Sequence, residues 1–151
     1  MTWLDYVTIG LIVIFMVIEV KRGAICAIID AVGIWVALKI AAVSYKGLAS
    51  ESLSQTWAYL IVFLVLSAAT IVISYLIHNQ LKSDLGAFDS AIAAGLGIFV
   101  GLCFAHVAFG AGHLTHGLNS EVMANSLFRG QVYELHALKG FLLFMSEIGN
   151  Y

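Results

Sequence analysis

Long apolar runs separated by short polar stretches dominate this chain. A helix that crosses the hydrocarbon core of a bilayer needs about 20 mostly apolar residues. Segments that meet this requirement are 3–20, 24–43, 56–77 and 91–110. The pattern therefore predicts an all-α integral membrane protein, with four transmembrane helices forming a transmembrane domain over residues 1–110.

The rest of the chain, residues 111–151, mixes apolar and polar positions. Phe128, Val132 and Leu135 recur at roughly helical spacing, and the apolar stretch 141–145 is too short to span a bilayer. We expect a C-terminal amphipathic helical tail. Such a tail lies either on the lipid surface or on a partner protein.

Composition agrees with a membrane protein and argues against a nucleic-acid partner. Of the 151 residues, 62% are hydrophobic and 11% are charged, whereas soluble domains average roughly 45–50% and about 25%. The excess apolar surface must face lipid or other proteins. The net charge is −2, and no basic stripe exists that would bind phosphates. Cys26 and Cys103 differ in depth by about 14 Å on their helices, which is too far for a disulfide.

The stretch Lys21-Arg22-Gly23 separates the first two apolar segments. We interpret it as a hinge, because glycine can adopt backbone angles that other residues avoid. Its two cations and Lys82 fall on one side of the predicted membrane, and only Lys46 falls in the loop on the other side. Basic residues favour the cytoplasmic side. The sequence thus predicts a multi-pass membrane protein with both termini outside the cytoplasm.

Small residues line one face of two of the predicted helices. In the last span they recur at every fourth position: Ala93, Gly97, Gly101 and Ala105. The second span has a partial match: Gly33, Ala37 and Ala41. Small residues let helix backbones approach closely in lipid. We expect these two faces to pack on each other within the chain, or on another copy or a partner protein.

Several polar residues lie inside the predicted spans. Asp30 is the costliest, and Thr70 lies at a similar depth, where its hydroxyl can donate to the Asp30 carboxylate. Three interpretations of Asp30 stay open: a satisfied structural hydrogen bond, an acid near Arg22, and part of a proton or cation path. Lys39 can extend to the outer interface, and a neutral His106 can share that polar layer.

Histidines and Cys103 near the end of the fourth span invite a metal interpretation. The residues are Cys103, His106, His113 and His116, but they lack the spacing of known metal-binding motifs. No nucleophile elbow, phosphate loop or paired carboxylate site is visible in the sequence. We therefore expect no enzyme activity, no metal and no cofactor.

Short motifs along the chain give a resemblance to a known family. The order is Trp3-Leu4-Asp5-Tyr6, then Arg22-Gly23, Gly33, Asp89, a glycine-rich last span and Asn125-Ser126-Leu127. This order resembles the colicin V production protein family (CvpA) of small bacterial inner-membrane proteins. Departures are Ala27 in place of an acid, Ser90 in place of an arginine, and the absence of proline.

The resemblance implies a four-span protein linked to secretion of a toxin peptide and to envelope maintenance, without known catalytic residues. We take this non-enzymatic, partner-dependent function as the leading hypothesis. An alternative is an accessory subunit of a large bacterial or mitochondrial inner-membrane complex. A second alternative is a small proton- or solute-conducting protein that uses Asp30. The expected partners are the lipid bilayer and other membrane proteins, with a homo-oligomer as one option.

Overall fold

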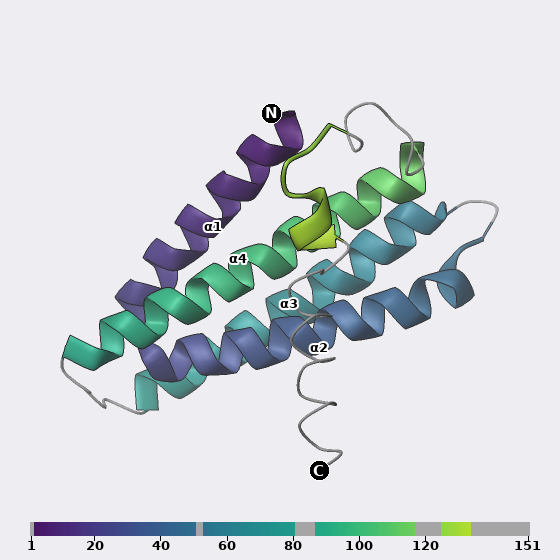
Figure 1. Ribbon diagram of the computed structural model, residues 1–151. Helices are drawn as coiled ribbons and strands as arrows, with labels where there is room; N and C mark the ends of the chain where they lie inside the picture. The colour runs from purple at the N-terminus through teal and green to yellow at the C-terminus, as the bar shows by residue number, and fades with distance from the viewer. Residues whose placement is uncertain (1, 51–52, 81–86, 117–124, 134–151) are drawn as a thin grey trace, which may run out of the picture.

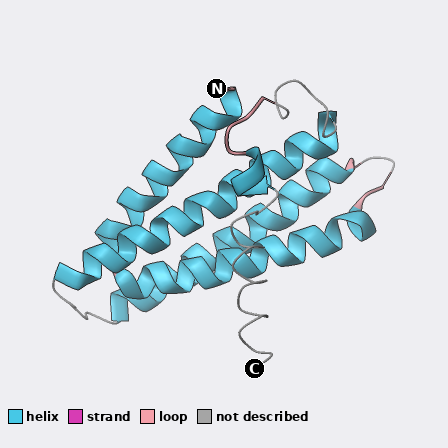
Figure 2. Ribbon diagram, viewed as in Figure 1, coloured by secondary structure: helices cyan, strands magenta, loops and turns pink. Residues whose placement is uncertain are grey.

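Four long helices build the structure. The computed structural model describes residues 2–50, 53–80, 87–116 and 125–133 (Figure 1). The elements are α1 (Trp3–Arg22), α2 (Ala24–Leu48), α3 (Gln55–Gln80), α4 (Ala87–His116) and the π-helical turn η1 (Arg129–Tyr133). Apart from an isolated bridge between Ser50 and Leu53, the described residues adopt no β-structure (Figure 2). The predicted all-α class is confirmed.

Each long helix is long and apolar enough to cross a membrane. Large hydrophobic side chains are exposed on all of them, for example Ile14 on α1, Trp35 on α2, Leu64 on α3 and Phe99 on α4. A soluble monomer rarely exposes so much contiguous apolar surface, whereas lipid tails accept it. A multi-pass membrane protein, the coarse part of the prediction, is therefore confirmed.

The helices extend further than the hydropathy pattern predicted. Polar residues at the ends continue the helices: α1 includes Lys21 and Arg22, and α2 continues to Leu48. The predicted three-residue hinge is therefore wrong, because Gly23 alone separates α1 from α2. The fourth helix runs on to His116, through the expected domain boundary at residue 110.

Consecutive helices run in alternating directions. Helices that follow each other in the sequence, such as α1 and α2, are nevertheless not always packed closely together. α1 and α2 diverge from Gly23, and α4 lies against both of them (Figure 1). α3 packs chiefly on α2 and touches α4 less. One end of the bundle therefore gathers the end of α1, the start of α2, the end of α3 and the start of α4. We call this the Gly23 end.

The small residues of α4 receive α1, which corrects the expected pairing of α4 with α2. A Cβ atom added at Gly97 would lie 2.7 Å from the Cα of Met16, and one at Gly101 would lie 2.6 Å from the Cα of Ile12. Ala93 and Ala105 are fully buried on the same helix. The backbones of α1 and α4 are thus in direct contact, as small residues permit in lipid.

The matching residues of α2 pack elsewhere. Gly33 lies against the side chain of Thr70 on α3. Ala37 and Ala41 are buried in the central core, which α2 forms with side chains of α3 and α4. The two small-residue faces therefore serve two different helix contacts within one chain.

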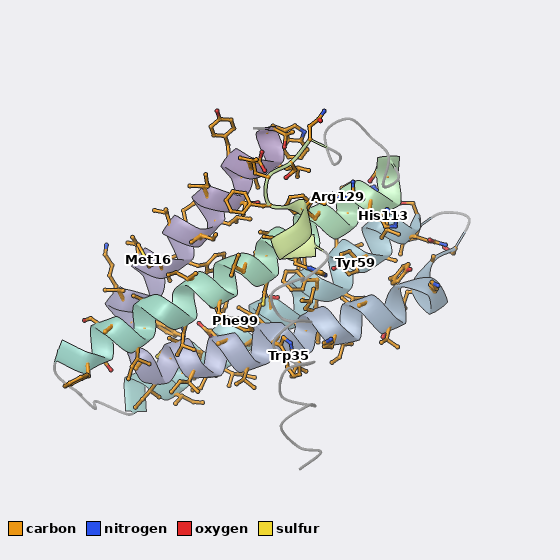
Figure 3. All side chains as sticks on the ribbon, in the orientation of Figure 1. Met16, Trp35, Tyr59, Phe99, His113 and Arg129 are labelled. Atoms are coloured by element: carbon orange, nitrogen blue, oxygen red, sulfur yellow. The ribbon has the colours of Figure 1, made fainter. Side chains whose placement is uncertain are left out.

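Aromatic rings fill the space between the diverging helices. The ring of Phe104 stacks on Phe15 at a centroid distance of 4.5 Å and meets Phe63 edge-on at 4.9 Å. Tyr59 is buried in the same core, whereas Trp35 lies on the outer side of α2 (Figure 3). One ring from each of α1, α3 and α4 therefore meets in this contact.

The described part of the tail packs on the chain's own bundle. Val132 of η1 is buried with Leu4 of α1 and with Ala105 and Phe109 of α4. The sequence predicts that the tail lies on lipid or on a partner protein. Residues 125–133 instead pack on α1 and α4 of the same chain. The remaining tail residues that we expected to be helical, such as Leu135, lie outside the described residues.

Candidate functional site: the polar cluster at the Gly23 end

Gly23 is held by an acid that lies far along the sequence, at the start of α4. Its φ of 88° and ψ of 166° lie in a region that is essentially restricted to glycine. The carboxylate of Asp89 on α4 accepts a hydrogen bond from the backbone N–H of Ala24 at 3.0 Å. A Cβ atom on Gly23 would lie 2.7 Å from the other Asp89 oxygen. Both the backbone angles and the close carboxylate therefore require glycine here.

Asp89 caps α2 from another helix. The first N–H groups of a helix lack partners within it, and a nearby anion stabilises that end. The residue before α2 is Gly23, which has no side chain to act as a cap. Asp89 supplies the missing acceptor and ties the start of α4 to the turn between α1 and α2. Hydropathy and residue spacing did not indicate Asp89, and only the family resemblance included it.

Arg22 joins three helices through its guanidinium group. Its Nη1 forms an ion pair with Asp30 Oδ2 on α2 and lies 3.5 Å from Glu19 Oε1 on α1. Its Nη2 donates to Ser74 Oγ on α3 at 2.9 Å. We call Glu19, Arg22, Asp30 and Ser74 the hinge cluster. Three interpretations of Asp30 were open. The structure agrees with the second one, in which Asp30 lies next to Arg22 and pairs with it.

Thr70 does not have the role expected for it. Its hydroxyl donates to the carbonyl oxygen of Leu66, one turn earlier on α3, at 3.0 Å. Its methyl group and hydroxyl lie against Gly33 instead of Asp30. Thr70 is therefore a packing residue of the α2–α3 contact, and the polar residue of α3 that reaches the hinge cluster is Ser74.

Ser74 was missed in the sequence, although a signal was present. Ser67 and Ser74 are seven residues apart on α3 and both are buried. Polar residues at that spacing mark one face of a helix. Ser74 Oγ also donates to the carbonyl oxygen of Cys26 at 3.4 Å, which ties α3 to α2 beside Arg22.

Another buried acid fastens the tail at the other end of the bundle. Asp5 Oδ1 accepts hydrogen bonds from Ser126 Oγ at 2.6 Å and from the backbone N–H of Phe128 at 3.4 Å. Asp5 Oδ2 accepts one from the backbone N–H of Thr2 at 2.6 Å. The Asp5 side chain is fully buried. It therefore links the start of α1 to residues more than a hundred positions away.

His106 completes the attachment of the tail. Its Nδ1 lies 2.7 Å from the carbonyl oxygen of Val132. Because a carbonyl oxygen only accepts, Nδ1 carries the proton and donates it. Lys39 is near enough to interact electrostatically with His106, but its side chain is exposed and its Nζ lies 5.7 Å from the ring centre of Trp35.

The residues considered for a metal include Cys103, His106 and His113, whose side chains the structure describes. Within the described residues, no three His, Cys, Asp or Glu side chains are placed to hold a metal ion. Cys26 and Cys103 are free thiols, and both are buried. The side chain of His116 lies outside the described residues. Arg22, Ser74 and Asp89, by contrast, connect helices to each other.

Comparison with known proteins adds no relative. No family model, no curated protein and no solved structure matches this chain.

Proposed function

We propose that this chain is a non-enzymatic inner-membrane protein of the CvpA kind, which supports toxin-peptide secretion or envelope maintenance through protein partners. In this proposal both termini face away from the cytoplasm. The Gly23 end, with Lys21 and Arg22, then faces the cytoplasm, in keeping with the positive-inside rule.

The observation that carries the proposal is that the motif residues meet in pairs. Asp5 of the first motif binds Ser126 of the last one. Gly23 of the second motif lies against Asp89, which precedes the last span. Motif residues that contact each other in the folded chain act together in one structure. Such contacts support the resemblance to the CvpA family more strongly than separate short motifs do.

The chemistry of these residues supports a non-enzymatic role. Asp5 is engaged by four hydrogen bonds, and Asp89 holds the turn at Gly23. Arg22 contacts three side chains at once. Groups so engaged are positioned to hold helices together, and this suits a protein that acts through its surface and its partners.

Complementation tests the proposal. The chain is expressed in a bacterial strain that lacks its own CvpA-type protein, and export of a colicin V-type peptide and growth in the presence of detergent are measured. We expect the chain to restore at least one of them. Asp89→Ala should abolish the rescue, and Lys46→Ala, an exposed change far from the Gly23 end, should not. A membrane-inserted chain that restores neither property would contradict the proposal.

A second candidate function is an accessory subunit of a larger inner-membrane complex. The observation that favours it is the exposed face of α2, where Lys39 stands among exposed apolar side chains such as Trp35 and Val43. A cation on a lipid-facing helix is costly unless it reaches an interface or a partner. Extraction in a mild detergent separates the two candidates, because a subunit should copurify with partners at fixed stoichiometry.

A further inference from the structure

Negative charge exceeds positive charge inside the hinge cluster. Glu19 and Asp30 are 1% and 0% exposed, and both touch the same nitrogen, Nη1 of Arg22. Two ionised carboxylates would leave one uncompensated negative charge in a region of low dielectric. An unpaired buried charge is very costly, and a buried group usually takes up or releases a proton to avoid it.

Each carboxyl group also has one oxygen without a partner. Glu19 Oε2 and Asp30 Oδ1 are buried and accept no hydrogen bond from any described residue. The two carboxyl groups are neighbours, because both contact the same nitrogen of Arg22. A single proton between them would satisfy both oxygens, because a protonated carboxyl donates and a carboxylate accepts.

We propose that Glu19 and Asp30 form a proton-binding site, in which the two carboxyl groups share one proton and Arg22 neutralises the remaining negative charge. The cluster is then electrically neutral and the two orphaned oxygens are satisfied. When the proton leaves, the cluster carries one negative charge at the point where α1, α2 and α3 meet.

The other titratable side chains that the structure describes at this end do not supply the missing positive charge. On α1, Lys21 is exposed. On α2, the Cys26 thiol donates to the carbonyl oxygen of Ser74 at 3.8 Å. On α4, Asp89 adds a further acid, which is engaged with the N–H of Ala24. On α3, Ser74 is the described polar group that reaches the cluster, and it is uncharged.

Arg22 is the exposed member of the hinge cluster. Its side chain is 19% exposed, whereas Glu19 and Asp30 are buried. Toward the other end of the bundle, the described titratable groups Asp5 and His106 are engaged with the tail. We therefore expect the site to exchange its proton at the Gly23 end, past Arg22, and to act as a binding site and not as a conducting path.

Infrared spectroscopy of the purified protein in lipid nanodiscs tests the proposal. A protonated carboxyl gives a carbonyl band that is separate from the carboxylate bands. We expect one such band at neutral pH, its loss at alkaline pH, and a shift on transfer to D₂O because the proton exchanges past Arg22. Glu19→Gln and Asp30→Asn should each remove the band. Asp5→Asn, a control at another buried acid, should leave it unchanged.

Isotope labelling keeps the test independent of how the variants fold. Carboxyl-labelled aspartate or glutamate in the unsubstituted chain should shift the band, and this identifies the side chain that holds the proton. Absence of the band in the unsubstituted protein at neutral pH would overturn the proposal. A band that survives both Glu19→Gln and Asp30→Asn would also overturn it, and so would displacement by Na⁺ at constant pH, which would indicate a metal-cation site.

Discussion

At the scale of single residues, Gly23 is the position with the least freedom to change. Its backbone angles exclude side chains, and the Asp89 carboxylate occupies the space that a Cβ atom would need. Hydrophobic patterning identified a turn here, but it could not identify Asp89 as the residue that closes it. That contact joins positions 65 residues apart, and no local pattern encodes it.

We expect Gly23→Ala to destabilise the folded protein by about 1–3 kcal/mol, because the residue would be held at glycine-only backbone angles. Reversible unfolding in mixed detergent micelles measures this change. Gly10→Ala is the matched control, since a Cβ atom at Gly10 meets nothing within 4 Å. Equal stability of the two variants would show that the backbone at position 23 is not strained by a side chain.

At the scale of secondary-structure elements, the glycines of α4 decide which helix it packs against. The i+4 spacing of small residues predicted a close helix contact but not its partner. Gly97 and Gly101 meet backbone atoms of α1, a helix that carries no matching small-residue motif. The choice follows from the divergence of α1 and α2, which leaves α4 between them.

Gly101→Ala should weaken the α1–α4 contact, since the new methyl group would press on the backbone of Ile12, which cannot rotate away. We expect a loss of about 1–3 kcal/mol, as is typical of overpacking. Gly95→Ala on the same helix meets nothing within 4 Å and should instead stabilise by about 0.5–1 kcal/mol. The same unfolding assay compares the two, and a stabilising Gly101→Ala would refute the contact.

At the scale of the whole molecule, one half-buried and one buried acid hold opposite ends of the bundle. Asp89 closes the Gly23 end, and Asp5 fastens the tail to the start of α1. Both acids have partners on distant parts of the chain. The bundle is thereby held at both ends by hydrogen bonds. This matters in lipid, because burying apolar side chains against each other there gives little free energy for helix association.

A double-mutant cycle measures how strongly the tail is fastened. Asp5→Ala and Ser126→Ala should each destabilise the fold, and the double change should cost less than the sum. Hydrogen bonds to charged groups contribute about 1.5–3 kcal/mol, so a coupling energy of that order is expected. Strictly additive effects would mean that the Ser126–Asp5 bond does not stabilise the protein.

Cysteine labelling tests the orientation in the membrane. Gly47→Cys, placed in a chain whose two native cysteines are changed to alanine, should react with a membrane-impermeant reagent from the non-cytoplasmic side. Lys21 is the residue to change, because it is exposed and lies outside the hinge cluster. Adding Lys21→Glu should reverse part of the population, because it weakens the positive-inside signal. Labelling of Gly47→Cys from the cytoplasmic side alone would contradict the predicted orientation.

Hydropathy by itself determined the class, the number of spanning helices and their approximate positions. This succeeded because membrane insertion depends on a local sum over about 20 residues, which the sequence contains directly. Helix ends were less well predicted, since polar residues such as Lys21 and Arg22 extend a helix past the apolar run. The pairing of Asp30 with Arg22 was among the open interpretations, because the two are close in sequence.

Only the tertiary structure decided the remaining contacts. Ser74 at Arg22, Asp89 at Ala24, Ser126 at Asp5 and α1 in the groove of α4 all join distant positions. In lipid, many arrangements of four apolar helices bury similar areas, so hydropathy does not rank them. The close approach of backbones and the satisfaction of a few buried polar groups select one arrangement, and both depend on three-dimensional geometry.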